Sequence, residues 1–168
     1  MKRLFAFLLL LSILLGLTAC TKQTAAIKEP VTFYYRRAAL SYDENDTVIL
    51  SQVADADGHK KDLHWILEKY LQGPEQKDVL QTFPQGTSLV SLEMDGDVFS
   101  VVLSHHLGNL TGVDLTIACA CLTKTIISLT NAKTVIIQAE NANLNGAPQI
   151  IMNEEILLLL DNSASSNN

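Results

Sequence analysis

The first 20 residues constrain this chain more than any other segment, because there an apolar run ends at a cysteine. Two basic residues open the sequence, and residues 4–17 are almost wholly apolar. This run of about 14 residues is shorter than the roughly 20 that an α-helix needs to cross a bilayer. A basic start, a short apolar segment and a small-residue end are typical of a secretory signal peptide. The sequence therefore predicts a signal peptide at residues 1–19.

The residues Leu17-Thr18-Ala19-Cys20 resemble the bacterial lipobox, the signal of the lipoprotein family. In that family the cysteine sulfur carries a diacylglyceryl group and the chain is cut just before it, so the resemblance implies that Cys20 is the lipidated first residue. Two acyl chains hold a protein stably on a bilayer without crossing it. We therefore expect a protein anchored on the outer face of the cytoplasmic membrane; an uncleaved membrane-spanning anchor is the alternative.

The charge of the mature chain limits its partners. Removing residues 1–19 takes away two of the 12 Lys and Arg residues and none of the 18 acidic ones, so the net charge becomes 10 − 18 = −8 with His neutral. Nucleic-acid phosphates need basic partners, so this charge argues against nucleic-acid binding. It also argues against electrostatic attraction to anionic lipid headgroups. We expect the lipid anchor alone to hold the protein at the membrane.

Apolar periodicity predicts two amphipathic helices. The first carries one continuous stripe formed by Leu63, Ile66, Leu67, Tyr70 and Leu71. Gly73 and Pro74 end it. The second is predicted from Thr111 to about Thr130, with Thr111 and Asp114 spaced as a capping box. Its buried stripe is expected to contain Leu115, Ala118, Cys119, Leu122, Ile126 and Leu129.

Runs rich in β-branched and aromatic residues predict the strands. Residues 31–37 and 47–54 flank the polar "SYDEND" and should pair as a hairpin. Asp95-Gly96 predicts a second hairpin with a two-residue loop. In that register Met94 faces Asp97, Leu92 faces Phe99 and Val90 faces Val101. A further strand is expected at residues 133–140 and a turn at Asn145-Gly146, whereas residues 154–160 fit either a strand or a short helix.

The resulting order, roughly ββαββαβ, predicts an α+β fold. We expect a single sheet of about five strands, with the two amphipathic helices packed on one face. Residues 20–30 would form a lipidated linker and residues 31–161 the domain. Residues 162–168 are polar and low in complexity, and we expect a disordered tail there.

Several histidines and serines could carry chemistry, but their spacing does not favour it. His105 and His106 are adjacent in a predicted strand, so their side chains should point to opposite faces and could not share a metal ion. The other two histidines, His59 and His64, are similarly isolated. No Gly-x-Ser-x-Gly elbow surrounds any serine, including Ser100 and Ser104.

The remaining polar and sulfur-containing candidates lead to the same prediction. "DADG" at Asp55–Gly58 is similar to the start of a calcium loop, but Ile66 stands where such a loop needs Glu, so a turn is expected. The acids of "YDEND" are expected in a solvated loop, which does not give two carboxylates the different environments that acid–base catalysis needs. Cys119 and Cys121 should point to different helix faces and be small buried hydrophobes. Trp65 is expected in core or edge packing. We therefore predict no catalytic residue, no metal and no cofactor.

Three segments resemble the GerMN domain family of sporulation and spore germination. They are "VTFYYRR", "LHWILEKYLQGP" and "TFPQGTSLVSLEMDGDVFSVVLS", and "CLTKTIISLTNAKTVIIQAE" adds the helix and strand that follow. The resemblance runs from about Thr32 to Gly146. This chain departs from the pattern at "AENANLNG", where members often have a Val-Asp-Gly-like turn, and it has room for one domain where the namesake has two.

The resemblance implies an extracytoplasmic lipoprotein with a role in sporulation, germination or envelope assembly. No catalytic residues are established for the family, so the expected function is a non-catalytic module that binds protein partners or itself through a sheet edge or helix face. The alternative is an envelope enzyme or ligand-binding lipoprotein acting on cell-wall glycan or a small solute. A cleft lined with paired polar groups would favour that alternative.

Overall fold

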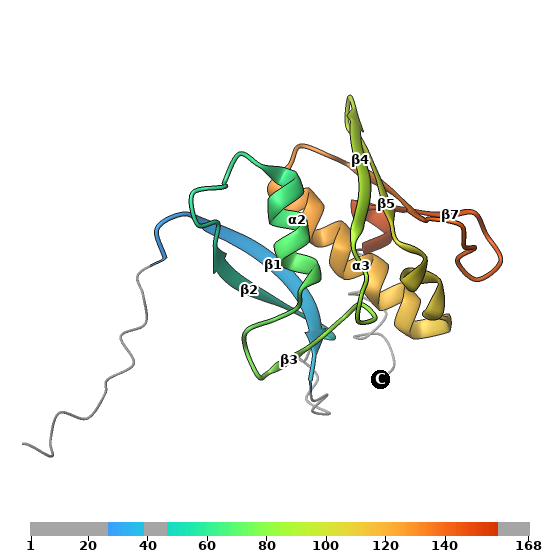
Figure 1. The fold of residues 1–168 in the computed structure, drawn as a ribbon, viewed down its shortest axis with the longest axis horizontal. Coiled ribbons are helices and arrows are strands. Elements are labelled where there is room, and N and C mark those ends of the chain that lie inside the picture. Colours follow the sequence, from blue (N-terminus) through green and yellow to red (C-terminus); the bar gives the residue numbers. More distant parts are fainter. Residues whose placement is uncertain (1–26, 39–46, 158–168) are drawn as a thin grey trace, which may run out of the picture.

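The computed structural model describes residues 27–38 and 47–157, and Figure 1 shows how they fold. The predictions for the signal peptide, Cys20, the "YDEND" acids and the C-terminal tail lie outside the described residues.

A three-stranded antiparallel sheet contains the first predicted hairpin. Strand β1 (Pro30–Arg37) pairs with β2 (Ile49–Asp55) over seven residue pairs, which confirms that hairpin. The two-residue strand β3 (Val79–Leu80) pairs with the end of β1, and it was not predicted. The strand order is β2-β1-β3.

A second sheet has four strands in the order β4-β5-β6-β7. These are β4 (Leu89–Asp95), β5 (Val98–Leu103), β6 (Thr134–Ala139) and β7 (Gln149–Asn153), of which β7 was not predicted. Strands β5 and β6 are parallel and joined through helix α3 (Gly112–Leu129), as a crossover requires, and the other pairs are antiparallel. The predicted single sheet is therefore wrong: the fold is α+β, but its strands form two sheets.

The sheets stay separate because a helix, not a strand, covers most of one edge of β1. Thr125 Oγ1 of α3 accepts a hydrogen bond from Tyr34 N at 3.0 Å, and the Ser128 hydroxyl of α3 donates to Thr32 O at 3.1 Å. From α2 (Leu63–Leu71), the Tyr70 hydroxyl donates to Tyr34 O at 2.9 Å. These side chains satisfy backbone groups that another strand would otherwise pair with.

Helix α2 (Leu63–Leu71) matches the first predicted helix. The Asp62 carboxylate caps it by accepting from Trp65 N at 3.1 Å. Its stripe is buried except for Leu63, which is half-buried, and Gly73 follows with a φ of +102°. The Tyr70 ring stacks on Tyr35 of β1 at a centroid distance of 5.0 Å, which joins α2 to the three-stranded sheet.

Helix α3 (Gly112–Leu129) occupies the range predicted for the second helix, and its predicted stripe is buried except for the half-buried Leu129. Ala120, Cys121, Thr123 and Thr125 are buried as well, because α3 contacts β1 on one side and β6 and β7 on another. By length and composition α3 could cross a membrane, but half of it is buried in the protein. It is the core helix that links the two sheets (Figure 1).

The predicted capping box at the start of α3 does not form. The Thr111 side chain makes no capping hydrogen bond. The Asp114 carboxylate pairs instead with the Arg36 guanidinium of β1, and Asn145 Oδ1 accepts from Gly112 N at 3.3 Å. Tertiary partners have therefore replaced the local cap.

The β4–β5 hairpin exists, but its predicted register is wrong by two residues. The loop consists of Gly96 and Asp97, so Met94 pairs with Phe99 and Leu92 with Val101. The register also shifts between Leu89 and Ser91. A shift of two keeps the same side chains on the core face, so the apolar pattern could not distinguish the two registers.

The C-terminal part contains the predicted turn and the segment at residues 154–160, for which both a strand and a short helix were expected alternatives. Asn145 and Gly146 have φ of +51° and +83°, which confirms the turn. Residues 154–157 are helical, and Asn153 Oδ1 accepts from Ile156 N at 2.8 Å. This favours the helix reading for the described part of residues 154–160.

Candidate interaction surface

One face of the four-stranded sheet is open to solvent. Along β5 and β6, every second residue is fully buried and the residues between are partly exposed. Phe99, Val101 and Ile137 point into the core. The opposite face presents three cross-strand rows: Asp95, Val98, Thr134 and Asn153; Glu93, Ser100, Ile136 and Ile151; and Ser91, Val102, Gln138 and Gln149. We call these twelve residues the open face.

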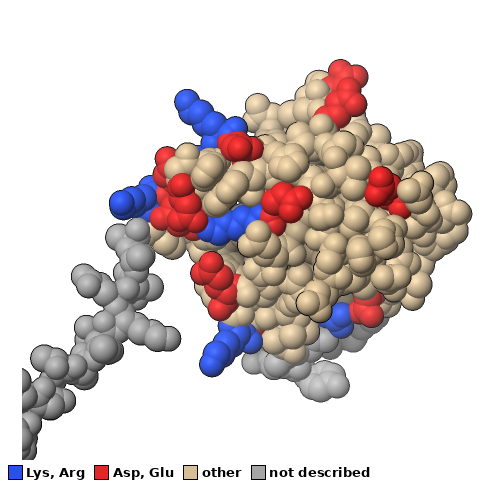
Figure 2. Space-filling model, in the orientation of Figure 1, with Lys and Arg blue, Asp and Glu red and all other residues tan. Residues whose placement is uncertain are grey.

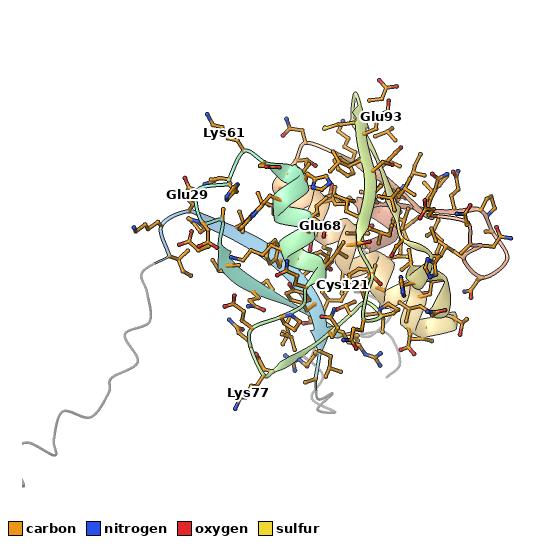
Figure 3. The ribbon with its side chains drawn as sticks, in the orientation of Figure 1. Glu29, Lys61, Glu68, Lys77, Glu93 and Cys121 are labelled. Atoms are coloured by element: carbon orange, nitrogen blue, oxygen red, sulfur yellow. The ribbon has the colours of Figure 1, made fainter. Side chains whose placement is uncertain are left out.

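The open face combines an apolar centre with an acidic margin. Ile136 and Ile151 are neighbours on β6 and β7, and Ile151 is 51% exposed. The only charged residues in the set are Glu93 and Asp95, both on β4. Glu93 lies on the β4–β5 hairpin, where acidic side chains are visible in the space-filling view (Figures 2 and 3). Ser100, a candidate nucleophile by residue type, lies among these side chains.

The two adjacent histidines lie differently from the prediction. They begin a 3-10 helix, η1 (His105–Asn109), which was not predicted. Their ring centroids are 4.1 Å apart, so the prediction that the two side chains point to opposite faces of a strand is wrong. His106 Nδ1 also lies 3.2 Å from the hydroxyl oxygen of Ser104. Gly108-Asn109 is the sequence signal that could have indicated a turn here.

Ser104 and His106 lie beside the turn formed by "FPQGT", residues 83–87. The buried Ser104 hydroxyl oxygen accepts from Ser88 N at 3.1 Å, and Ser104 N donates to Ser88 O at 2.9 Å. Gly86 has a φ of +87°, and a Cβ there would lie 3.2 Å from His106 Nε2. A Ser–His contact can activate a nucleophile, but this serine is already engaged with the turn.

The two cysteines of α3 are buried, free thiols, as predicted. Burial raises the pKa of Cys119 and of Cys121 to about 12. Both thiols are therefore protonated at neutral pH and have little nucleophilic character.

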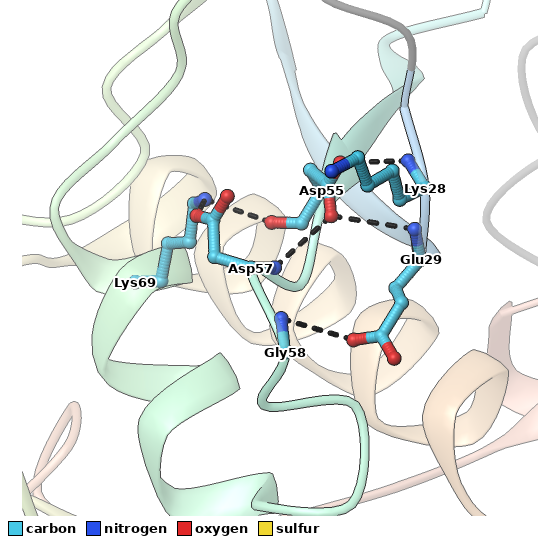
Figure 4. Close-up of polar contacts among 6 residues, drawn as sticks. All are labelled: Lys28, Glu29, Asp55, Asp57, Gly58 and Lys69. Carbon is cyan, nitrogen blue, oxygen red and sulfur yellow. Dashed lines mark hydrogen bonds and ion pairs between the residues drawn. The ribbon is translucent and has the colours of Figure 1, made fainter.

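The "DADG" segment forms a turn, as predicted, in contact with the start of the domain (Figure 4). The Asp55 carboxylate accepts from Lys28 N at 2.7 Å, Asp57 N at 3.0 Å and Glu29 N at 3.3 Å. These backbone donors, Lys28 N first, lower the pKa of Asp55. Within the described residues, no group of three or more His, Cys, Asp or Glu side chains is placed to hold a metal ion.

Trp65 packs at an edge of the domain, as predicted. It is half-buried, its ring stacks on His59 at a centroid distance of 4.3 Å, and Lys69 Nζ lies 5.2 Å from its centroid. Lys69 also pairs with Asp57 and donates to Asp55 O at 2.8 Å. His64 is exposed on α2. The sequence did not show that His59 and Trp65 meet, because a turn separates them.

A hollow of about 360 Å³ lies beside the start of α3. Its lining includes Leu80 and Phe83, and the ion-paired Arg36 and Asp114. Its volume is at the lower end of the range for small-molecule sites.

The arrangement is that of an α+β module whose two sheets are joined by a core helix. Residues 32–145 match the Germane family model, described as sporulation and spore germination. The chain therefore belongs to the Germane, or GerMN, family. A comparison with curated proteins finds no match.

Two solved structures are similar in fold. The tandem GerMN domains of the sporulation protein GerM from Bacillus subtilis align with a TM-score of 0.50 and 16% identity, over 71% of this chain and 43% of that one. A protein from Clostridium perfringens described as a candidate lipoprotein aligns with a TM-score of 0.39 and 22% identity, over 76% of this chain and 89% of that one. The chain thus spans less than half of the GerM structure.

Proposed function

We propose that this protein is a lipid-anchored, extracytoplasmic GerMN module that binds another envelope protein and has no catalytic chemistry of its own. Its process is sporulation, germination or envelope assembly, in keeping with the family. The lipobox-like residues ending at Cys20 support the anchor. The open face, with Ile136 and Ile151 in contact with solvent, is the observation that carries the binding role.

The chemistry of the open face favours a basic partner. Its apolar centre can bury area against a protein surface, and Glu93 and Asp95 at one margin match Lys or Arg. Two copies of this chain, each with a mature charge of −8, would repel one another. The face therefore fits an envelope protein that carries basic residues beside an apolar strip better than it fits a second copy.

Ser104 and the two cysteines of α3 support a role without catalysis. The Ser104 hydroxyl oxygen accepts a hydrogen bond from Ser88 N, directly after the turn, and the thiols of Cys119 and Cys121 are buried and protonated. A nucleophile needs an accessible, activated atom. These residues therefore favour an interaction module over an enzyme.

Site-specific photocrosslinking in intact cells tests the binding surface. A photoreactive residue at Ile151 is expected to give a discrete adduct with another protein, and one at the exposed Lys77 is the matched control. Ile136→Lys should abolish the adduct and the associated sporulation or germination phenotype. Equal adducts from both positions would contradict the proposal. An adduct of twice the chain mass would show that the partner is a second copy of this chain and not a basic protein.

The hollow beside α3 supports one alternative, a ligand-binding lipoprotein. It combines apolar walls with the Arg36–Asp114 pair, as a site for a small polar solute or glycan fragment would. Soluble cell-wall fragments should then raise the melting temperature of the wild-type protein, and Arg36→Ala should remove the effect. No shift with the wild-type protein would exclude these fragments as ligands.

A further inference from the structure

The chain enters the domain from the predicted anchor at a surface with basic and aromatic side chains. We define this entry surface by Ile27, Lys28, His59, Lys60, Lys61 and Trp65. Its parts are in contact, since Ala56 N donates to Glu29 O at 2.9 Å and Gly58 N donates to Glu29 Oε2 at 3.0 Å. The stacked rings of His59 and Trp65 extend it onto α2.

The length of the chain before this surface limits its distance from the bilayer. Eight residue steps separate Cys20 from Lys28, and a fully extended chain covers at most about 3.6 Å per residue, or about 29 Å in total. The Asp55 carboxylate fixes the backbone of Lys28 and Glu29 to the domain (Figure 4). This step rests on the proposed function, because it places Cys20 at the membrane. Lys28, at the edge of the entry surface, then stays within about 30 Å of the headgroups.

The entry surface does not share the negative charge of the whole chain. The neighbouring acids keep their charge but are held by contacts within the domain: Asp55 and Glu29 accept from backbone N–H groups, Asp57 pairs with Lys69, and Asp62 caps α2. Counted with Lys28, Lys60, Lys61 and Lys69, these four acids give a local charge of 4 − 4 = 0, against −8 for the mature chain. Lys28, Lys60 and Lys61 are exposed. Within residues 27–38 and 47–157, no ion pair involves them.

The uncharged members of the entry surface also suit a bilayer interface. Ile27 is 49% exposed beside Lys28. Trp65 is half-buried, and tryptophan is enriched at the headgroup level, where one side of the ring is apolar and the other is wet. Lysines near an anionic membrane add attraction that falls off within a Debye length.

We propose that the entry surface lies against the anionic lipid headgroups of the bilayer that carries the anchor. Lys28, Lys60 and Lys61 contact the phosphates, and Trp65 lies at the interface. The anchor therefore does not act alone. The net charge of the chain argues against attraction to anionic lipid, but the charges of this region balance, and the exposed Lys28, Lys60 and Lys61 can contact phosphates. This docking orients the domain with the start of α2 toward the membrane.

Trp65 fluorescence tests the proposal, since it is the only tryptophan in the chain. The native acylated protein is reconstituted into vesicles of phosphatidylcholine alone or mixed with phosphatidylglycerol, each with a headgroup-level quencher. Quenching should be stronger in the anionic vesicles. It should weaken as salt rises from 0.1 to 1 M, because the Debye length falls from about 10 to about 3 Å.

Two charge-matched variants locate the contact. Lys60→Gln/Lys61→Gln should lower the ratio of docked to undocked protein in anionic vesicles by roughly 5-fold per lysine. The control is Lys77→Gln/Lys133→Gln, which removes the same charge from other exposed positions and should leave quenching unchanged. Lys61 and Lys77 lie beyond opposite ends of α2 (Figure 3). Far-UV circular dichroism checks that both variants are folded.

The two proposals fail in different ways. A protein recovered without acyl chains would contradict the anchor. A protein that is acylated and vesicle-bound, but shows equal Trp65 quenching in both lipid mixtures, would overturn the docking alone. Equal losses in the two double variants would also overturn it, because the attraction would then not depend on the entry surface.

Discussion

At the scale of single residues, the Thr125 hydroxyl forms a hydrogen bond that a neighbouring strand would otherwise form with β1. Thr125 Oγ1 accepts the hydrogen bond of Tyr34 N in the middle of β1. Thr125→Val keeps the shape of the side chain and leaves that partly buried N–H group without its partner. We expect a loss of about 1–3 kcal/mol in the free energy of unfolding, measured by urea denaturation. Thr125→Ser keeps the hydroxyl and should lose less; equal losses would show that the hydrogen bond is unimportant.

The buried thiols of Cys119 and Cys121 predict a pH dependence. Their pKa is raised to about 12 in the folded protein, against about 8.5 for an exposed thiol. Between these values the unfolded chain loses protons that the folded chain retains, so unfolding becomes easier as pH rises. The wild-type protein should therefore lose stability between about pH 9 and 12 more steeply than Cys119→Ala/Cys121→Ala. Parallel urea curves over that range would contradict the burial of the thiols.

At the scale of elements, the Asp55 carboxylate joins the start of β1 to the turn after β2. Its pKa is lowered in the folded protein, so its contribution to stability is present above the ordinary value of about 3.9 and is lost as pH falls through the folded pKa. Asp55→Ala should therefore lower the urea midpoint at pH 7 and matter less near pH 2. Asp97→Ala, at an exposed turn, is the control. A midpoint for Asp55→Ala that equals the wild-type value at pH 7 would contradict this role.

The two faces of the four-stranded sheet should differ in how much a charged substitution lowers the free energy of unfolding. Ile151→Lys places an ammonium group on the open face and should change the free energy of unfolding by about 0.5 kcal/mol or less. Ile137→Lys places the same group in the core and should cost about 4 kcal/mol or more. Thermal or urea denaturation of both variants measures the difference. Similar losses would show that the open face is covered.

How well each element could be predicted depends on whether its cause is local. The stripes of α2 and α3 recur at helical spacing, so periodicity was enough. The cap of α3 failed because Arg36 and Asn145, distant in sequence, supply the partners of Asp114 and Gly112 N. The Ser104–His106 contact was missed because His105 and His106 start a 3-10 turn where a continuing strand was expected.

At the scale of the whole molecule, the number of sheets was the main feature that the sequence did not predict. Strand patterns show that a segment is extended, but not which neighbour satisfies its edge. Here hydroxyl groups of Thr125, Ser128 and Tyr70 cover the edge of β1, so the later strands build a second sheet. One feature of the sequence indicated a second layer: α3 carries small or apolar residues outside its predicted stripe, at Ala120 and Cys121. A helix buried on more than one side needs more than one layer to cover it.

The intact mass of the native protein extracted from membranes tests the central claim most directly, because every other role proposed here assumes a module tethered outside the cell. The account predicts a chain that starts at Cys20 and carries a diacylglyceryl group, and a Cys20→Ala variant without that mass. An unmodified chain that retains residues 1–19, or a wild-type protein recovered in the soluble fraction without acyl chains, would contradict it.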